Sequence, residues 1–184
     1  MLGESILSAA AGFETAVDAG GLTRELFAVG VGGLVIAFAA WWLYFDHPGH
    51  LAPTPRSAFR WGYLHAVVFG GLAALGAGLH VAAEAVSGAA EGEHPIDLRA
   101  AAVAVAVPIA LFLVGLVVIM LVTGTAVRGW RIYPKLVGAA VIVAVGVTGS
   151  VPVTVVASAI VVALLACSMV LTNWRPSEPA VLNS

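Results

Sequence analysis

The chain has 184 residues, of which 61% are hydrophobic and 10% are charged, and its mean hydropathy is +1.04. A water-soluble domain of this length cannot hide so much apolar surface in its core, so a lipid bilayer must cover most of it. The net charge of −2 and the scattered basic residues exclude a nucleic-acid partner. The single cysteine, Cys167, excludes an internal disulfide and is expected to be a small core residue.

The first segment, 1–17, predicts a partial helix. A helix of about 16 residues rises only ~24 Å, which is less than the bilayer core. Glu4 stands where a secretory signal peptide would carry a basic residue, so we expect the segment to stay in the protein. It is typical of the back half of a transmembrane helix whose front half is missing.

Five longer apolar segments predict full transmembrane helices, because about 20 apolar residues cross a bilayer core of ~30 Å. The break between the last two is expected at 149–152, where a glycine ends one helix and a proline lies in the first turn of the next. We therefore expect one all-α membrane domain over 1–184, a polytopic integral membrane helix bundle with five full helices and the partial one. The expected spans are 26–45, 61–83, 100–127, 134–149 and 152–172.

Proline and small residues predict how the helices pack. Pro108 lies inside an expected span and would bend it unless neighbours supply partners for the carbonyl that it frees. Small residues spaced by four favour close approach of helices, although chance matches are an equal alternative in a chain so rich in alanine and glycine. The ridges are Gly33 with Ala37, and Gly70 with Ala74 and Gly78.

The basic residues predict the orientation. The segments 46–60, 128–135 and 173–184 hold six of the eight basic residues, and the opposite side holds Arg24 and Arg99. Because loops rich in Lys and Arg face the cytoplasm, we expect these three segments, including the tail 173–184, to be cytoplasmic. The polar segment from Glu84 to Arg99 contains glycine and proline and is expected to be an outside loop.

Three ionisable residues are candidates for transport or proton relay. Inserting a carboxylate at bilayer depth costs about 3 kcal/mol, and such a group usually faces a cavity or a partner. Glu4 is therefore a functional candidate if it lies deep in the bilayer. If it lies among the lipid headgroups, it has no such role. Asp46 and His65 would meet across an antiparallel helix pair, and a histidine beside a carboxylate can relay protons. The alternative interpretation is a solvated Asp46 and a packing His65.

His80 and Glu84 are weaker candidates. They are spaced i and i+4 and share a helix face, but a solvated face is the favoured interpretation. His65 and His80 are separated by about 22 Å of helix and cannot bind one metal ion together. The segment 46–50, DHPGH, offers three possible metal ligands, but the sequence has no nearby cysteine or second cluster of ligands to go with them. We therefore expect no metal site and no cofactor.

Enzymatic chemistry has no support in the sequence. The only lysine, Lys135, lies at an expected cytoplasmic interface, so no lysine in the bilayer can form a retinal Schiff base. Hydrolase, metalloprotease and nucleotide-binding motifs are absent from the sequence. We therefore expect that the protein is not an enzyme.

Three stretches carry a family resemblance: LGESIL at 2–7, WWLYFD at 41–46 and WGYLHAVVFGGLAALGAG at 61–78. In order and spacing they resemble the C-terminal half of the bacterial low temperature requirement protein A family, whose members are longer multi-pass membrane proteins. The resemblance implies a location in the bacterial inner membrane. It also favours Glu4, Asp46 and His65, which lie within these motifs, but it brings no established biochemical activity.

The family places further helices before the LGES element, whereas Met1 immediately precedes Leu2 here. We therefore expect a truncated or split member whose partners are the bilayer and either a chain that supplies the missing helices or further copies in a homo-oligomer. Two function hypotheses remain open. One is a transporter or channel component that uses intramembrane carboxylate and histidine groups, and the other is a non-transporting membrane assembly or stress-adaptation factor.

Overall fold

A computed structural model describes residues 2–45, 55–90, 96–122 and 131–173. These ranges are helical apart from short connections and contain no strand, so the prediction of an all-α chain is confirmed. The elements are α1 (Leu2–Gly20), α2 (Arg24–Phe45), α3 (Pro55–Ala90), α4 (Leu98–Val122), α5 (Tyr133–Thr148) and α6 (Val151–Asn173).

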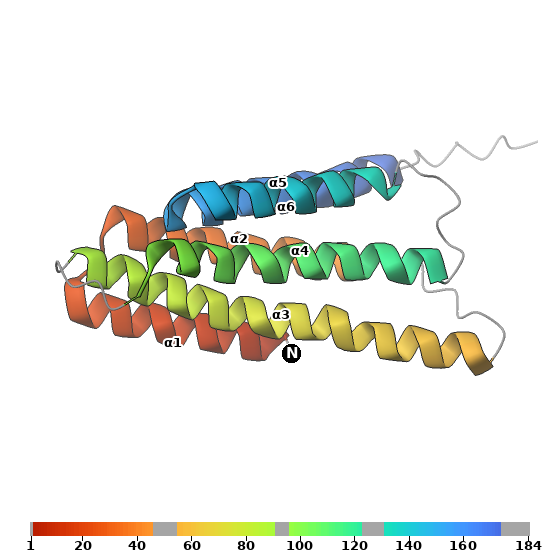
Figure 1. Ribbon diagram of the computed structural model, residues 1–184, viewed down its shortest axis with the longest axis horizontal. Helices are drawn as coiled ribbons and strands as arrows, with labels where there is room; N and C mark the ends of the chain where they lie inside the picture. The colour runs from red at the N-terminus through yellow and green to blue at the C-terminus, as the bar shows by residue number, and fades with distance from the viewer. Residues whose placement is uncertain (1, 46–54, 91–95, 123–130, 174–184) are drawn as a thin grey trace, which may run out of the picture.

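The helices lie side by side in one elongated bundle (Figure 1). Helix α3 contacts α1, α2 and α4, while α4 also contacts α5 and α6, and α2 packs against α6. Helix α4 therefore lies near the centre, where Val105, Ile109, Phe112 and Leu113 are almost fully buried. Helix α1 begins beside the middle of α3 and reaches only one end of the bundle (Figure 1).

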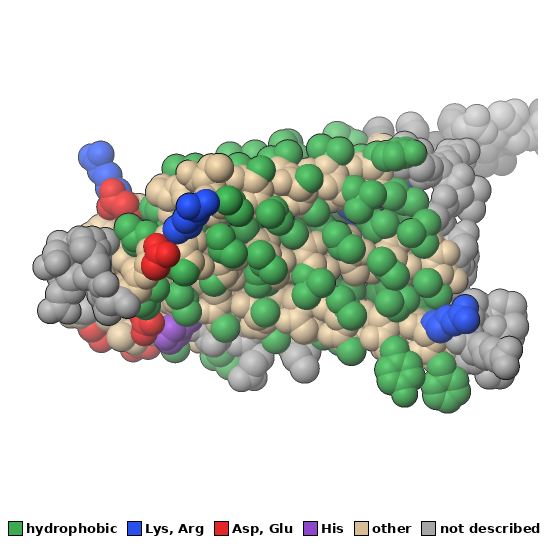
Figure 2. Space-filling view, viewed as in Figure 1, with side chains coloured by type: hydrophobic (Ala, Val, Ile, Leu, Met, Phe, Trp, Pro, Cys, Tyr) green, Lys and Arg blue, Asp and Glu red, His purple; other side chains and the backbone are tan. Residues whose placement is uncertain are grey.

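The surface of the bundle is that of a membrane protein. Four helical segments are long and apolar enough to cross a membrane, namely α2, α4, residues Ala58–Gly88 of α3 and Val151–Thr172 of α6. Helix α5 is apolar but has 16 residues, a rise of about 24 Å. Hydrophobic side chains cover the middle of the face in Figure 2, and charged side chains lie towards its ends.

Helix α3 is longer than the expected span 61–83. It begins at Pro55, because proline lacks an N–H and fits the first helical turn. At the other end it continues through Gly88 to Ala90, so the expectation of a loop beginning at Glu84 is wrong. Burial of Ala85 and Val86 outweighs the glycine's cost of about 1 kcal/mol relative to alanine.

The other helix ends lie close to their predicted positions. Helix α1 extends past the expected 1–17 and ends at Gly20. The next residue, Gly21, has a φ of +74°, which suits glycine, and its N–H donates to the Val17 carbonyl at 2.8 Å. The predicted break between α5 and α6 is confirmed, and the Gly149 N–H donates to the Val145 carbonyl at 2.6 Å. The expected end of the third span, 123–127, lies outside the described residues.

The small-residue ridge on α3 differs from the predicted one. Gly70 and Ala74 are exposed, and a Cβ added to Gly70 would meet nothing within 4 Å. Gly71 and Gly78 face α4 instead, because each residue turns the helix by about 100°. A Cβ added to Gly71 would lie 3.1 Å from the Pro108 carbonyl oxygen. Only the Gly78 end of the predicted ridge is therefore at a helix contact.

Gly78 lies against the position in α4 that Pro108 disturbs. Proline lacks an N–H, so the Ala104 carbonyl four residues earlier loses its helical donor. A Cβ added to Gly78 would overlap this carbonyl oxygen. The glycine lets the two backbones approach closely at this oxygen. Helix α4 stays helical through Pro108.

Candidate functional site

His65 lies in an aromatic pocket between α3 and the end of α2. Its side chain is 9% exposed, although the surrounding segment Ala58–Gly88 is apolar enough to cross a membrane. The ring centroid is 4.0 Å from that of Trp61, 5.7 Å from that of Phe69 and 5.8 Å from that of Tyr44 on α2. Trp61 and Phe69 reach His65 because residues spaced by four share one face of a helix.

The backbone fixes the proton arrangement of the His65 ring. Nδ1 lies 2.6 Å from the Trp61 carbonyl oxygen. A carbonyl oxygen can only accept a hydrogen bond, so Nδ1 carries the hydrogen and donates it. In the neutral ring the lone pair then lies on Nε2, which is the nitrogen that can take up a further proton.

The structure brings the end of α2 to His65 but does not describe Asp46. The Tyr44–His65 ring contact places the chain two residues before Asp46 beside His65. Asp46 itself lies outside the described residues, as does the segment 46–50 with its possible metal ligands. The predicted meeting of Asp46 and His65 stays a prediction.

Glu4 lies in the first turn of α1. Farther along α1, a Cβ added to Gly12 would lie 2.7 Å from the His80 ring, so these two positions are level with one another. Glu4 is eight residues before Gly12, or about 12 Å along the helix. Because α1 begins beside the middle of α3 (Figure 1), the backbone at Glu4 lies away from the bundle end at which α1 terminates.

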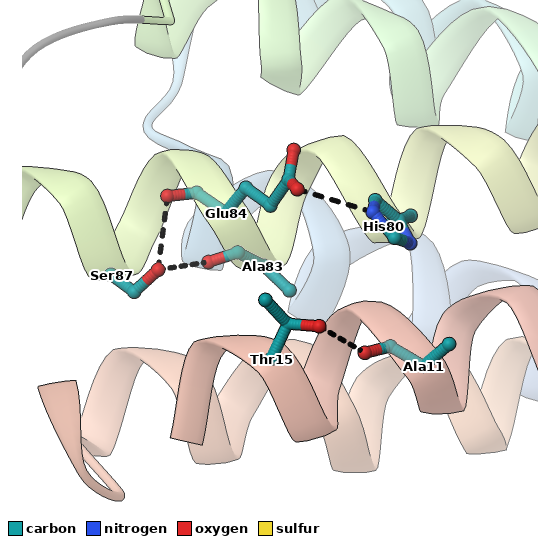
Figure 3. Close-up of polar contacts among 6 residues, drawn as sticks. All are labelled: Ala11, Thr15, His80, Ala83, Glu84 and Ser87. Carbon is teal, nitrogen blue, oxygen red and sulfur yellow. Dashed lines mark hydrogen bonds and ion pairs between the residues drawn. The ribbon is translucent and has the colours of Figure 1, made fainter. Parts of the chain in front are cut away.

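His80 and Glu84 form the pair that their spacing predicts. Nε2 of His80 lies 3.2 Å from Oε1 of Glu84, and the two side chains are 35% and 41% exposed. Figure 3 shows this pair on α3 beside α1, where Thr15 bonds to Ala11 of its own helix. The close contact of His80 with Gly12 was not apparent from the sequence and gives His80 a role in packing α1 on α3.

Sequence reasoning missed two buried polar side chains. Lys135 in the first turn of α5 is 2% exposed, and its Nζ donates to the Arg131 carbonyl at 3.1 Å. Ser158 on α6 is fully buried, and its hydroxyl has no hydrogen-bond partner within the described part of the chain. Hydropathy carries no signal for either, because it does not report which face of a helix packs inward.

Two further expectations concern metal ligands and the cysteine. No group of three or more His, Cys, Asp or Glu side chains that could hold a metal ion occurs within the residues that the structure describes. Cys167 on α6 is exposed, so the expectation of a core cysteine is wrong. It lies on the outer side of an apolar helix, where lipid would cover it in a membrane.

The fold and the buried histidine define a multi-pass helical membrane protein with a sparse set of interior polar groups. The sequence model of the bacterial low temperature requirement A protein family matches residues 1–170, and the chain belongs to this family. The resemblance carried by the LGES, WWLYFD and WGYLH motifs is thereby confirmed. No curated protein and no solved structure matches the chain.

Proposed function

We propose that the chain is a transporter or channel component in which His65 carries a proton. The observation that carries the proposal is the burial of this ionisable side chain within an apolar, membrane-length segment. Ionisable groups at such positions are costly to insert and mostly mark ion or proton pathways. The reaction is movement across the bilayer, without chemical conversion of a substrate.

In this proposal Nε2 of His65 takes up and releases the proton, since Nδ1 is held by the Trp61 carbonyl. Asp46, which follows α2, exchanges protons with His65 at one end of the bundle. Glu4 is the candidate carboxylate farther along the same path. The three aromatic rings around His65 restrict its contact with lipid and water.

The proposed arrangement has five membrane crossings, with α5 counted as the shortest, and α1 as a partial helix. We propose the bacterial inner membrane and a cytoplasmic C-terminus. The support is the distribution of basic residues, six against two, under this single orientation. Asp46 and His65 then lie towards the cytoplasmic side, and the His80–Glu84 pair lies towards the opposite side.

Proton flux into vesicles that contain a pH-sensitive dye tests the proposal. The parent protein should move protons, whereas His65→Ala should insert normally and lose the flux. His80→Ala is the matched control in the same helix and should keep it. Asp46→Asn should weaken flux less than His65→Ala, because an interfacial carboxylate tunes the relay without being its sole carrier. Undiminished flux in His65→Ala would remove His65 from the path.

A non-transporting membrane assembly or stress-adaptation factor is the second candidate. It is favoured by the way His65 is held, bonded to its own helix and packed against rings, which is also how a purely structural histidine is satisfied. The other buried polar side chains of the described chain, Ser87, Lys135, Thr154 and Ser158, lie on three different helices. Absence of proton flux in the parent, purified together with any chains that accompany it from native membranes, would favour this candidate.

A further inference from the structure

An apolar cavity of about 380 Å³ opens between α1 and α2. Its floor is formed by Leu72, Leu75 and Leu79 of α3, which are buried. Its walls include Ala10 of α1 and Val31 of α2, which are exposed, so the cavity is open to the surroundings of the bundle. Gly30 and Gly33 also line the cavity, and there the side chains of Phe13 and Leu79 pack directly on the α2 backbone.

The length of the cavity matches one leaflet of a bilayer. On α2 its lining runs from Phe27 to Ala37, which is a rise of about 15 Å. The hydrocarbon core of a bilayer is about 30 Å thick, so one leaflet contributes about 15 Å. The cavity thus extends from the end of the bundle near the α1–α2 turn to about its middle.

The lining determines what can fill this space. Among the residues that the structure describes, Glu14 is the one ionisable side chain in the lining, so ordered water would find too few partners there. An empty cavity would cost the dispersion contacts of its walls. A lipid hydrocarbon chain is both apolar and thin enough.

Charged side chains lie at the end of the cavity nearest the turn between α1 and α2. Glu14 lines it, and Asp18 lies one turn farther along the same face of α1. Arg24 lies one turn before the lining residue Phe27 on the same face of α2. All three are exposed, and within the described chain none of them pairs with another charged side chain.

We propose that this cavity binds one acyl chain of a phospholipid with an ammonium-bearing headgroup. Arg24 complements the phosphate, and the carboxylates of Glu14 and Asp18 complement the ammonium. An anionic phospholipid without the ammonium would satisfy Arg24 but would be repelled by the two carboxylates. The bound chain completes the contact between α1 and α2 over α3, independently of any transport through His65.

Photolabelling of the full chain in lipid nanodiscs tests this site. The probe is phosphatidylethanolamine with a diazirine in its acyl chain, and phosphatidylglycerol with the same chain is the comparison. We expect the first probe to label peptides 6–14 and 27–37 in preference to α6, and the second to label them up to about fivefold less, as a charge pair of about 1 kcal/mol implies. Equal labelling by the two probes would overturn the proposed headgroup selectivity and with it the proposal.

Cavity-filling variants provide the matched controls. Ala10→Phe places a ring in the cavity and should reduce labelling of the two peptides to the level of α6. Ala11→Phe alters the next residue, which is exposed but does not line the cavity, and should label like the parent. Labelling undiminished in Ala10→Phe would overturn the proposal. If this variant lost helix content, Ala37→Leu would fill the same cavity from α2 and decide the question.

The charges are tested separately. Glu14→Gln and Arg24→Gln should each bring labelling by the two probes closer together, because each removes one half of the headgroup complement. Glu25→Gln changes an exposed carboxylate on a different face of α2 and should leave the preference unchanged. A preference that survives the double variant Glu14→Gln, Arg24→Gln would show that these side chains do not select the headgroup.

Discussion

Ser158 on α6 carries a fully buried hydroxyl group. Its Oγ has no hydrogen-bond partner in the described chain, whereas the Ser87 hydroxyl donates to the Ala83 carbonyl at 3.2 Å. A buried polar group without a partner costs about 1 to 3 kcal/mol. We therefore expect Ser158→Ala to raise the free energy of unfolding by about 1 kcal/mol. Reversible unfolding in mixed micelles, followed by circular dichroism, measures it.

Ser87→Ala is the control for this prediction. It removes a hydroxyl that is satisfied within its own helix, so its loss should leave stability unchanged or slightly lower. A loss of stability in Ser158→Ala would contradict the prediction and would mean that this hydroxyl has a partner in the membrane.

Single residues show where sequence reasoning stops. The motif around His65 identified an ionisable group inside a span, and the structure buries it. The sequence could not give the Trp61 carbonyl as the partner of Nδ1, because that bond depends on the side-chain rotamer. Nor could it predict the burial of Lys135. This residue lies in the first turn of α5, and a lysine near a helix end usually extends its ammonium group into solvent.

At the scale of helices, the contact between α3 and α4 depends on glycine at one position. Gly78→Leu would drive a side chain into the Ala104 backbone and should lower the free energy of unfolding by about 3 kcal/mol. Gly70→Leu, two turns earlier in the same helix, faces open space and should be neutral or stabilising by up to about 1 kcal/mol. Equal stability of the two variants in detergent would contradict a tight contact.

The helices themselves were largely predictable from composition. Long uncharged runs and the glycine-proline break gave the existence of α2, α4, α5 and α6, because a bilayer imposes both length and apolarity. The end of α3 was not predictable, since the segment 84–90 is polar enough to suggest a loop. It is helical because its alanine and valine side chains are buried against other parts of the bundle. Those contacts cannot be seen in the segment's own residues.

At the scale of the whole molecule, the orientation in the membrane is open to a direct test. We expect Ala58→Cys to be protected from an impermeant thiol reagent added outside intact cells, and Asp97→Cys to react, because the basic residues favour a cytoplasmic start of α3. Both variants need a Cys167→Ser background, since the native cysteine is exposed. The opposite labelling pattern would reverse the orientation.

The sequence supports the class of the molecule better than its arrangement. Composition and the family motifs lead to a helical membrane protein, which the structure and the family match bear out. Which helices touch was not predictable: α2 packs on α6, far away in the chain, and α1 packs on α3 through Gly12. Such contacts depend on how the surfaces of several helices fit one another, and the pattern of residues along one helix does not show which other helix fits it.

The tight connection between α5 and α6 has a consequence for biosynthesis. The two helices are separated by Gly149 and Ser150 alone, and the Ser150 carbonyl accepts the first helical hydrogen bond of α6, from the Thr154 N–H, at 2.9 Å. From Leu136 to Asn173 the chain carries no charged residue. The turn can therefore enter the translocation machinery without moving a charged side chain across the membrane. We expect α5, too short to be a strong insertion signal by itself, to partition into lipid together with α6 as one hairpin.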